Sequence, residues 1–201
     1  MHASESFKII FKEGSNIFER LSPEQFRIAR RRIIECILAT DMASHGKKLA
    51  EVKAKLTMLE IENGKNLDKL ILPESAKDAI IKNNATVQMF LSECVHTADL
   101  SNPAKMNTIF IKWTDLVYQE FFAQGDKEKE LGMNYSMLCD RNTTNIHKSQ
   151  VGFISFIVMD QFEVMLNICP EIKVYMDNLK MNLKYCEDKV EQTRKDNVSR
   201  I

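Results

Sequence analysis

The sequence predicts an all-α protein, and three observations lead to this fold class. Apolar residues recur at spacings of three and four along several segments, which places them on one face of a helix. Six glycines and four prolines in 201 residues leave few chain breaks, so the pieces between them are long. No stretch shows the alternation of apolar and polar residues that is typical of a half-buried strand.

The first clearly marked helix begins after Ser22. Ser22 is placed as the N-cap, Pro23 occupies the first helical position and Gln25 lies at N3, which together form a capping box. We expect this helix to run to Ala39. The next helix has one apolar face, and its pattern breaks into a surface loop over 62–66. The apolar face is formed by Leu49, Val52, Leu56 and Leu59.

Two more helices are expected in the middle of the chain. One begins near Pro73 and must end before Asn102 and Pro103, because the residue before a proline is disfavoured in the α region. Its inward face is expected to carry Val87, Phe90, Leu91, Cys94 and Val95. The second helix is predicted from an apolar stripe at spacings of three and four. The stripe consists of Phe110, Trp113, Val117 and Phe121.

The C-terminal part combines one polar segment with two helices. The segment 134–144 is polar and turn-like, and a short charged segment before it is bracketed by Gly125 and Gly132. Helical pattern resumes through 150–153 and stops at Pro170. The last helix has a regular amphipathic stripe. The stripe consists of Ile172, Met176, Leu179, Leu183, Cys186 and Val190.

Composition excludes several classes of function. Twenty-eight Lys and Arg balance 28 Asp and Glu, so the chain has no general attraction to nucleic acid or to an anionic membrane. The longest apolar run, 151–158, is far shorter than the roughly 18 residues that span a bilayer. Five cysteines without a C-x-x-C pair indicate reduced thiols. We therefore expect a cytoplasmic protein. Separately, the sequence contains no glycine-rich phosphate loop.

The first cluster that could carry chemistry is 96–103, His-Thr-Ala-Asp-Leu-Ser-Asn-Pro, at the end of a mostly apolar helix. Each buried polar group left unpaired costs about 1–3 kcal/mol. A metal or a ligand would satisfy these groups, and so would a neighbouring helix N-terminus or an arginine. His96 by itself is more often a hydrogen-bonded core histidine than a ligand.

The second cluster is 148–153, Lys-Ser-Gln-Val-Gly-Phe. Gln150 lies one turn from Phe153, so its amide could hydrogen-bond the edge of a ligand while the ring stacks on the ligand's face. The alternative is a core phenylalanine beside a surface glutamine. Trp113 and Phe121 likewise read first as core residues. Serine and cysteine residues lack a recognisable local signature of nucleophilic catalysis.

At these two clusters the sequence resembles the class I 3′,5′-cyclic-nucleotide phosphodiesterases. The matching blocks occur in the family's order from about residue 2 to residue 180. They are 37–42 with His45, 96–103, 113–115, 120–122 with 124–126, Met133, 139–140 and 148–153. The resemblance implies an all-helical catalytic domain, of which residues 1–187 would be the C-terminal part, followed by a polar tail over 188–201.

The resemblance also implies a reaction and a set of site residues. Cyclic AMP or cyclic GMP would be hydrolysed by a hydroxide held between two metal ions, zinc and magnesium. Asp99 matches a metal-ligating aspartate, and Gln150 matches the glutamine that binds the purine edge. Phe153 and Val117 match the clamp on the two faces of the base, and Asn102 a residue linked to nucleotide selectivity. Two further positions line the pocket, Trp113 and Phe121.

Two histidine motifs of the family, H-N-x-x-H and H-D-x-x-H, do not occur in this sequence. They supply the family's other protein metal ligands and its catalytic acid, so we assign no catalytic residue. His45, His96 and His147 match none of the missing positions. Asp99 alone would hold a divalent ion weakly, because such sites draw on several ligands.

Three interpretations follow from this departure. The chain is part of a complete phosphodiesterase, a non-catalytic remnant of its nucleotide pocket, or a helical interaction module. The retained Asp99, Gln150 and Phe153 favour the first. We expect the parent protein to hydrolyse cyclic nucleotide and this chain alone to be inactive. The choice between cyclic AMP and cyclic GMP and the oligomeric state are left open, and any membrane tether would belong to other regions.

Overall fold

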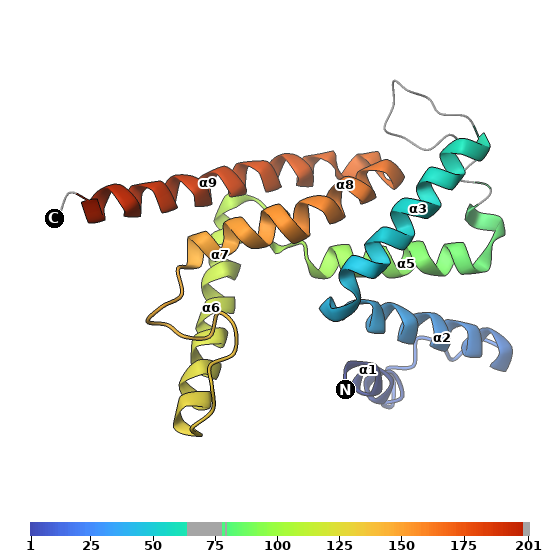
Figure 1. Ribbon diagram of the computed structural model, residues 1–201. Helices are drawn as coiled ribbons and strands as arrows, with labels where there is room; N and C mark the ends of the chain where they lie inside the picture. The colour runs from blue at the N-terminus through green and yellow to red at the C-terminus, as the bar shows by residue number, and fades with distance from the viewer. Residues whose placement is uncertain (64–77, 79, 199–201) are drawn as a thin grey trace. The chain divides into compact units, whose positions relative to one another are not determined.

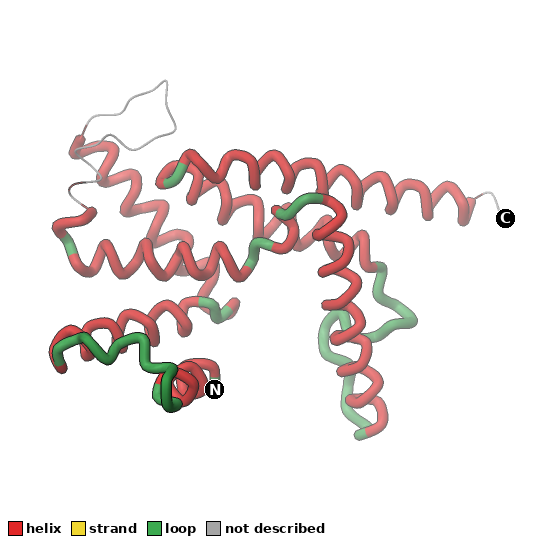
Figure 2. The backbone as a smooth tube through the Cα atoms, turned by 180° about the vertical axis from the view of Figure 1, so that it is seen from behind, coloured by secondary structure: helices red, strands yellow, loops and turns green. Residues whose placement is uncertain are grey.

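The computed structural model describes residues 1–63, 78 and 80–198, and within these residues it contains helices and no strand (Figure 2). The all-α fold class is therefore confirmed. The chain divides into two compact units, Met1–Asp99 and Leu100–Ile201, which we call the first and the second unit.

The described part of the first unit consists largely of helices (Figure 1). They are α1 (His2–Ile10), α2 (Pro23–Ala39), the 3₁₀ turn η1 (Met42–Ser44), α3 (His45–Asn63) and α5 (Asn84–Asp99). α2 is central to this unit, because it packs against α1 on one side and α5 on another. Its polar partners include the Gln88 side chain, whose Nε2 donates to the Arg32 carbonyl at 3.3 Å.

The predicted start and end of α2 are confirmed. The Ser22 hydroxyl accepts a hydrogen bond from the Gln25 N–H at 3.2 Å, and the Gln25 side chain accepts one from the Ser22 N–H at 2.9 Å. The helix ends at Ala39. Sequence patterns did not predict the aromatic cluster that joins α1 to α2. In it the Phe26 ring lies 5.8–6.5 Å from three other rings, those of Phe7, Phe11 and Phe18.

The apolar face predicted for α3 is confirmed, since all four of its residues are buried. The expected loop over 62–66 is wrong at its start, because α3 continues to Asn63; positions 64–66 lie outside the described residues. The reason is that Glu62 and Asn63 are compatible with a helical backbone, although neither continues the apolar pattern.

The end predicted for α5 is confirmed at Asp99, while the expected start near Pro73 lies outside the described residues. The expected inward face is confirmed at Phe90, which is buried, and Val87 is half-buried, but the other three positions are wrong. Leu91 and Val95 are 40% and 41% exposed, and Cys94 is exposed too. The buried face contains polar residues instead: Thr86, Glu93, His96 and Thr97. Apolar periodicity misses such a face because it follows apolar residues alone, whereas His96 and Thr97 here form hydrogen bonds to His45 and to the Glu93 carbonyl.

The second unit is a helical assembly in which α9 packs along α7 and α8 (Figure 1). Its elements are η2 (Asn102–Ala104), α6 (Asn107–Glu130), α7 (Ile146–Phe153), the π-helical segment η3 (Ile154–Val158), α8 (Met159–Ile168), η4 (Pro170–Ile172) and α9 (Lys173–Val198). The predicted stop before Pro170 is confirmed. The polar segment 134–144 is free of helix, as expected.

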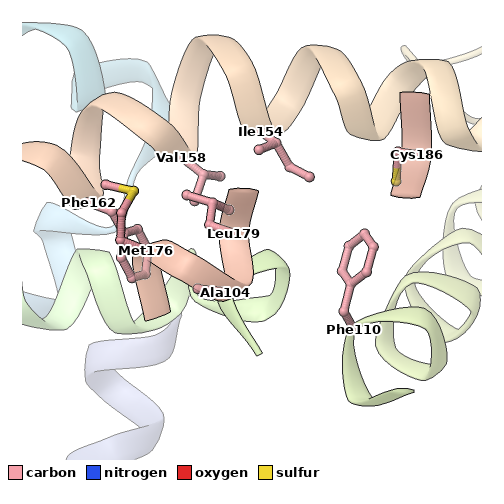
Figure 3. Packing of buried hydrophobic residues seen from close by; sticks show 8 residues of the cluster. All are labelled: Ala104, Phe110, Ile154, Val158, Phe162, Met176, Leu179 and Cys186. Atoms are coloured by element: carbon pink, nitrogen blue, oxygen red, sulfur yellow. The ribbon is translucent and has the colours of Figure 1, made fainter. Parts of the chain in front are cut away.

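The core of the second unit is one apolar cluster (Figure 3). It consists of Ala104, Phe110, Ile154, Val158, Phe162, Met176, Leu179 and Cys186. In Figure 3 the ring of Phe110 points toward Cys186, so α6 and α9 meet through these two side chains. Burial raises the pKa of the Cys186 thiol to about 11, which keeps it protonated and unreactive. The stripe predicted for α9 is confirmed by its buried members, although the helix runs on to Val198.

The stripe predicted for α6 is only partly correct. Phe110 is buried, but Trp113 is 54% exposed, and Val117 and Phe121 are half-buried. The buried face runs instead through Phe110, Thr114, Tyr118, Gly125 and Glu128. Tyr118 and Gly125 face the core, so the buried face of α6 is displaced by one residue from the predicted apolar stripe.

The segment 134–144 is attached to the C-terminal half of α6. The carboxylate of Glu128 accepts hydrogen bonds from the N–H and hydroxyl of Ser136 at 2.7 and 2.6 Å, and from Gln124 Nε2 at 2.8 Å. The bonds from Ser136, and then that from Gln124, lower the pKa of Glu128. Arg141 forms an ion pair with Asp126.

By length and composition, one helical stretch exceeds the apolar run 151–158 found in the sequence. Ile146–Ile168 forms a 23-residue helical stretch whose hydropathy of 1.5 would allow it to cross a membrane. The expected limit of 151–158 was too short because isolated polar residues such as Gln150 do not interrupt the average. Ile154, Val158 and Phe162 of this stretch belong to the core cluster, which accounts for its apolar character.

We predict that Gly125→Ala destabilises the second unit by about 1–3 kcal/mol, as overpacking does. A Cβ at position 125 would lie 2.0 Å from the backbone oxygen of Cys139, so the segment 134–144 must move. Gly152→Ala is the matched control, because its Cβ would meet no atom within 4 Å. In a helix this control should raise stability by about 0.5–1 kcal/mol. Urea unfolding measures both, and equal stabilities would contradict the prediction.

Candidate functional site

Gln150 and Phe153 are positioned by α7, whose N-terminus is capped by Asn145. The Asn145 side chain accepts a hydrogen bond from the Lys148 N–H at 2.9 Å. Gln150 is buried, with 8% of its surface exposed, and Phe153 is half-buried against the core cluster. The alternative of a core phenylalanine beside a surface glutamine is therefore wrong for the glutamine, while Phe153 does pack against the core. The two side chains are three residues apart, which places them on one helical face.

The amide of Gln150 is buried without being satisfied. Its Oε1 has no hydrogen-bond partner in the described part of the chain. Such a group costs about 1–3 kcal/mol unless something pairs with it. The π-helical segment η3 begins directly after Phe153. π-helical turns are rare and are frequently found at functional sites.

Asn102 is the first residue of η2, and its Oδ1 is also buried without a partner among the described residues. The backbone that follows it is held by α9. Asn182 Nδ2 donates to the Pro103 and Lys105 carbonyls at 2.7 and 2.8 Å, and Asn178 Nδ2 donates to the Ala104 carbonyl at 3.1 Å. Hydrogen bonds from α9 therefore hold the backbone of the turn that carries Asn102.

The remaining pocket residues lie along α6. Trp113, Val117 and Phe121 are four residues apart and remain partly exposed. The interpretation of Trp113 as a core residue is wrong, since it is 54% exposed, whereas Phe121 is half-buried. Phe121 packs edge to face against Tyr118, with ring centroids 5.6 Å apart. These side chains form an accessible apolar face rather than a sealed one.

Sequence reasoning missed Thr114. This residue is buried, and its hydroxyl oxygen has no partner in the described residues. The signal was present in the sequence: Thr114 lies four residues from Phe110 and from Tyr118, so it is a polar position within the buried face of α6. The second unit therefore holds all six predicted pocket residues and this further hydroxyl.

Asp99, the predicted metal ligand, belongs to the first unit. It is the last residue of α5 and is exposed. The C-terminal end of a helix carries partial negative charge, which favours a cation beside it. However, the described residues contain no group of three or more His, Cys, Asp or Glu side chains that could hold a metal. The residues present thus do not fit a zinc and magnesium pair.

His96 is a core histidine, as expected. It is 1% exposed, and its Nε2 lies 2.9 Å from Nδ1 of the buried His45. Burial lowers the pKa of His96 below 6.5, and the charge of His45 and Lys48 acts in the same direction. Glu93 and Asp99 act in the opposite direction. The pair is a structural contact between α3 and α5 rather than a ligand set.

Comparison with known proteins gives consistent matches. A family model described as 3′5′-cyclic nucleotide phosphodiesterase matches residues 1–179. The 3′,5′-cyclic-AMP phosphodiesterase 4C of Rattus norvegicus is 36% identical over 94% of this chain, which spans 33% of that protein. The 3′,5′-cyclic-AMP phosphodiesterase isoform F of Drosophila melanogaster is 35% identical over 94% of this chain and 27% of its own length. The chain thus spans a third or less of these relatives.

A solved structure shares the fold. The phosphodiesterase domain of the Salpingoeca rosetta rhodopsin phosphodiesterase matches with a TM-score of 0.81 at 25% identity. The match covers 100% of this chain and 56% of that one. The structure of LmjPDEB1 in complex with IBMX also shares the fold, with a TM-score of 0.79 at 24% identity over 95% of this chain and 52% of that one.

We predict that the first unit loses stability as the pH falls below about 6.5. The unfolded chain protonates His96 near its ordinary pKa of 6.5, whereas the pKa of His96 in the folded chain is lower because the ring is buried. The unfolded state therefore binds more protons in that window, so unfolding becomes easier. NMR titration of the His96 ring, with urea unfolding at pH 5.5 and 7.5, tests this.

His147→Gln is the background for this measurement, because burial also lowers the pKa of His147. Removing that histidine leaves His96 as the histidine whose pKa is lowered by burial in the described residues. Adding His96→Gln should flatten the pH dependence. A ring of His96 that titrates at or above pH 6.5 would contradict the prediction.

Proposed function

Because this chain belongs to the 3′,5′-cyclic nucleotide phosphodiesterase family, we propose that its second unit binds the base of a cyclic nucleotide. In the parent enzyme that nucleotide is hydrolysed to the 5′-monophosphate. The observation that carries the proposal is the buried, unpaired amide of Gln150 one turn from the half-buried ring of Phe153. A purine satisfies both groups, since its edge forms hydrogen bonds and its face stacks.

In this proposal each residue has a distinct task. Gln150 reads the edge of the base, while Phe153 and Val117 hold its two faces. Asn102 supplies a further acceptor or donor, which is why its buried Oδ1 is unpaired in the described residues. Apolar walls complete the pocket: Trp113 and Phe121. Aromatic stacking and a few placed polar groups are the usual composition of a small-molecule site.

We propose that the site accepts both cyclic AMP and cyclic GMP. An amide offers a donor at one atom and an acceptor at the other, and turning it exchanges the two. No described residue hydrogen-bonds the Gln150 side chain, so no neighbour fixes one orientation. Relatives named cyclic-AMP phosphodiesterases support cyclic AMP as one of the two.

Hydrolysis needs more than this chain supplies. The resemblance implies zinc and magnesium, but Asp99 is the one predicted ligand, and the described residues form no metal-binding group. The two histidine motifs of the family are absent from the 201 residues. We therefore propose that the chain alone is inactive and that metal-dependent hydrolysis belongs to the parent enzyme.

We also keep a cytoplasmic location as a proposal. All five cysteines are free thiols, which supports a reducing compartment.

The balanced charge of 28 cationic and 28 anionic side chains supports a small-molecule ligand rather than nucleic acid.

Binding is tested by calorimetry with cyclic AMP and cyclic GMP. We expect both nucleotides to bind, and Gln150→Ala to weaken each about tenfold, since a lost hydrogen bond costs about 1–1.5 kcal/mol. Gln119→Ala is the matched control, because this glutamine is exposed on α6. Equal losses in the two variants, or none, would reject Gln150 as the base-reading residue.

Activity is tested on the same protein with Mg²⁺ and Zn²⁺ present. We expect no hydrolysis of either nucleotide, because one carboxylate cannot hold a pair of divalent ions. Measurable metal-dependent turnover would overturn the inactivity proposal. A folded chain that neither binds nor hydrolyses would instead favour a helical interaction module.

A further inference from the structure

We propose that Asn182 of α9 is a positioning residue, which orients Asn102 and thereby sets the balance between the two nucleotides. This inference rests on the proposed function of the second unit. Asn182 acts through the backbone 103–105 and has no contact with the base in the proposal.

Both polar atoms of the Asn182 carboxamide form hydrogen bonds. The residue is 0% exposed, and its Nδ2 donates to two carbonyls, those of Pro103 at 2.7 Å and Lys105 at 2.8 Å. Its Oδ1 accepts a hydrogen bond from Asn107 Nδ2 at 2.9 Å. Three good hydrogen bonds from one buried side chain fix the distance between α9 and the turn.

The backbone at 103–105 needs this side chain. Within the turn, the Ala104 N–H donates to the Ser101 carbonyl and the Lys105 N–H to the Asn102 carbonyl, at 3.0 and 3.1 Å. The next three carbonyls are not used by the turn and face asparagines of α9: Asn182 binds those of Pro103 and Lys105, and Asn178 that of Ala104. Buried carbonyls are almost always paired, so the asparagines account for all three.

Asn102 has no such support for its own side chain. Its Oδ1 is buried and unpaired in the described residues, so no hydrogen bond to this oxygen holds it and its position follows the backbone of η2 that carries it. A small rotation of that turn would move this oxygen relative to a bound base. Because Asn182 fixes the turn at both Pro103 and Lys105, it determines where Asn102 points.

A merely structural role predicts a different outcome from a positioning role. If Asn182 only stabilised the fold, its replacement would lower the unfolding temperature and leave the properties of the folded molecules unchanged. If it positions Asn102, the folded molecules themselves would differ: the ratio of the two nucleotide affinities and the environment of the Asn102 amide would change.

The test replaces Asn182 by aspartate, which has the same shape but cannot donate to the two carbonyls. We expect the ratio of the Kd values for cyclic AMP and cyclic GMP to change about three- to tenfold, as for one hydrogen bond. The side-chain ¹H–¹⁵N signal of Asn102 should shift in the nucleotide-free protein. Asn167→Asp is the charge-matched control on α8, because Asn167 bonds only the carbonyl of its own helix at Glu163.

The outcomes separate the two proposals. A lower unfolding temperature with an unchanged affinity ratio and an unmoved Asn102 signal would overturn the positioning role. If the wild-type chain binds neither nucleotide, the proposed function fails, and the Asn102 signal alone decides the positioning role.

If Asn182→Asp does not fold, Asn178→Ala replaces it. That variant removes the bond to Ala104 from a half-buried site, and the same shift at smaller size supports the proposal, while no shift rejects it.

Discussion

Three consecutive backbone carbonyls, at 103–105, constrain the whole second unit. These carbonyls lie at the end of the 3₁₀ turn η2, which provides no backbone N–H group to bind them. Side chains of α9 donate hydrogen bonds to them instead. Asn178 and Asn182 satisfy them only if α9 lies in one register along the unit. That register in turn determines which α9 side chains, including Met176 and Leu179, enter the core beside α7 and α8. A polar requirement thus selects the arrangement of the apolar core.

The candidate site combines buried polar atoms with a partly exposed apolar surface. Gln150, Asn102 and Thr114 bring buried polar atoms with no partner in the described residues, while Trp113 on α6 remains half exposed. Natural proteins break rules of polar satisfaction and apolar burial mainly at functional positions. The same unit holds Glu128 and Asn182 firmly through hydrogen bonds, so it also contains buried polar groups that are well paired.

Sequence patterns predicted most helices because capping and regular periodicity are local properties. The capping box at Ser22 and the stripe of α9 are examples, and the fold class follows from them. Buried faces were mispredicted where polar residues turn inward, at Glu93 on α5 and at Thr114 on α6, because burial there depends on partners distant in the sequence. The site residues came from the family resemblance, and their roles stay predictions; Asn182 escaped notice because an asparagine within an apolar stripe looks like an interruption.

The bond between Asn182 and the Pro103 carbonyl joins positions 79 residues apart. During synthesis the turn therefore emerges long before the side chain that secures it. Until α9 has been made, the carbonyls at 103–105 remain hydrated, and the apolar faces of α7 and α8 lack their cover. Since domains generally fold as units as the chain emerges, the second unit completes its folding only when nearly its entire length has left the ribosome.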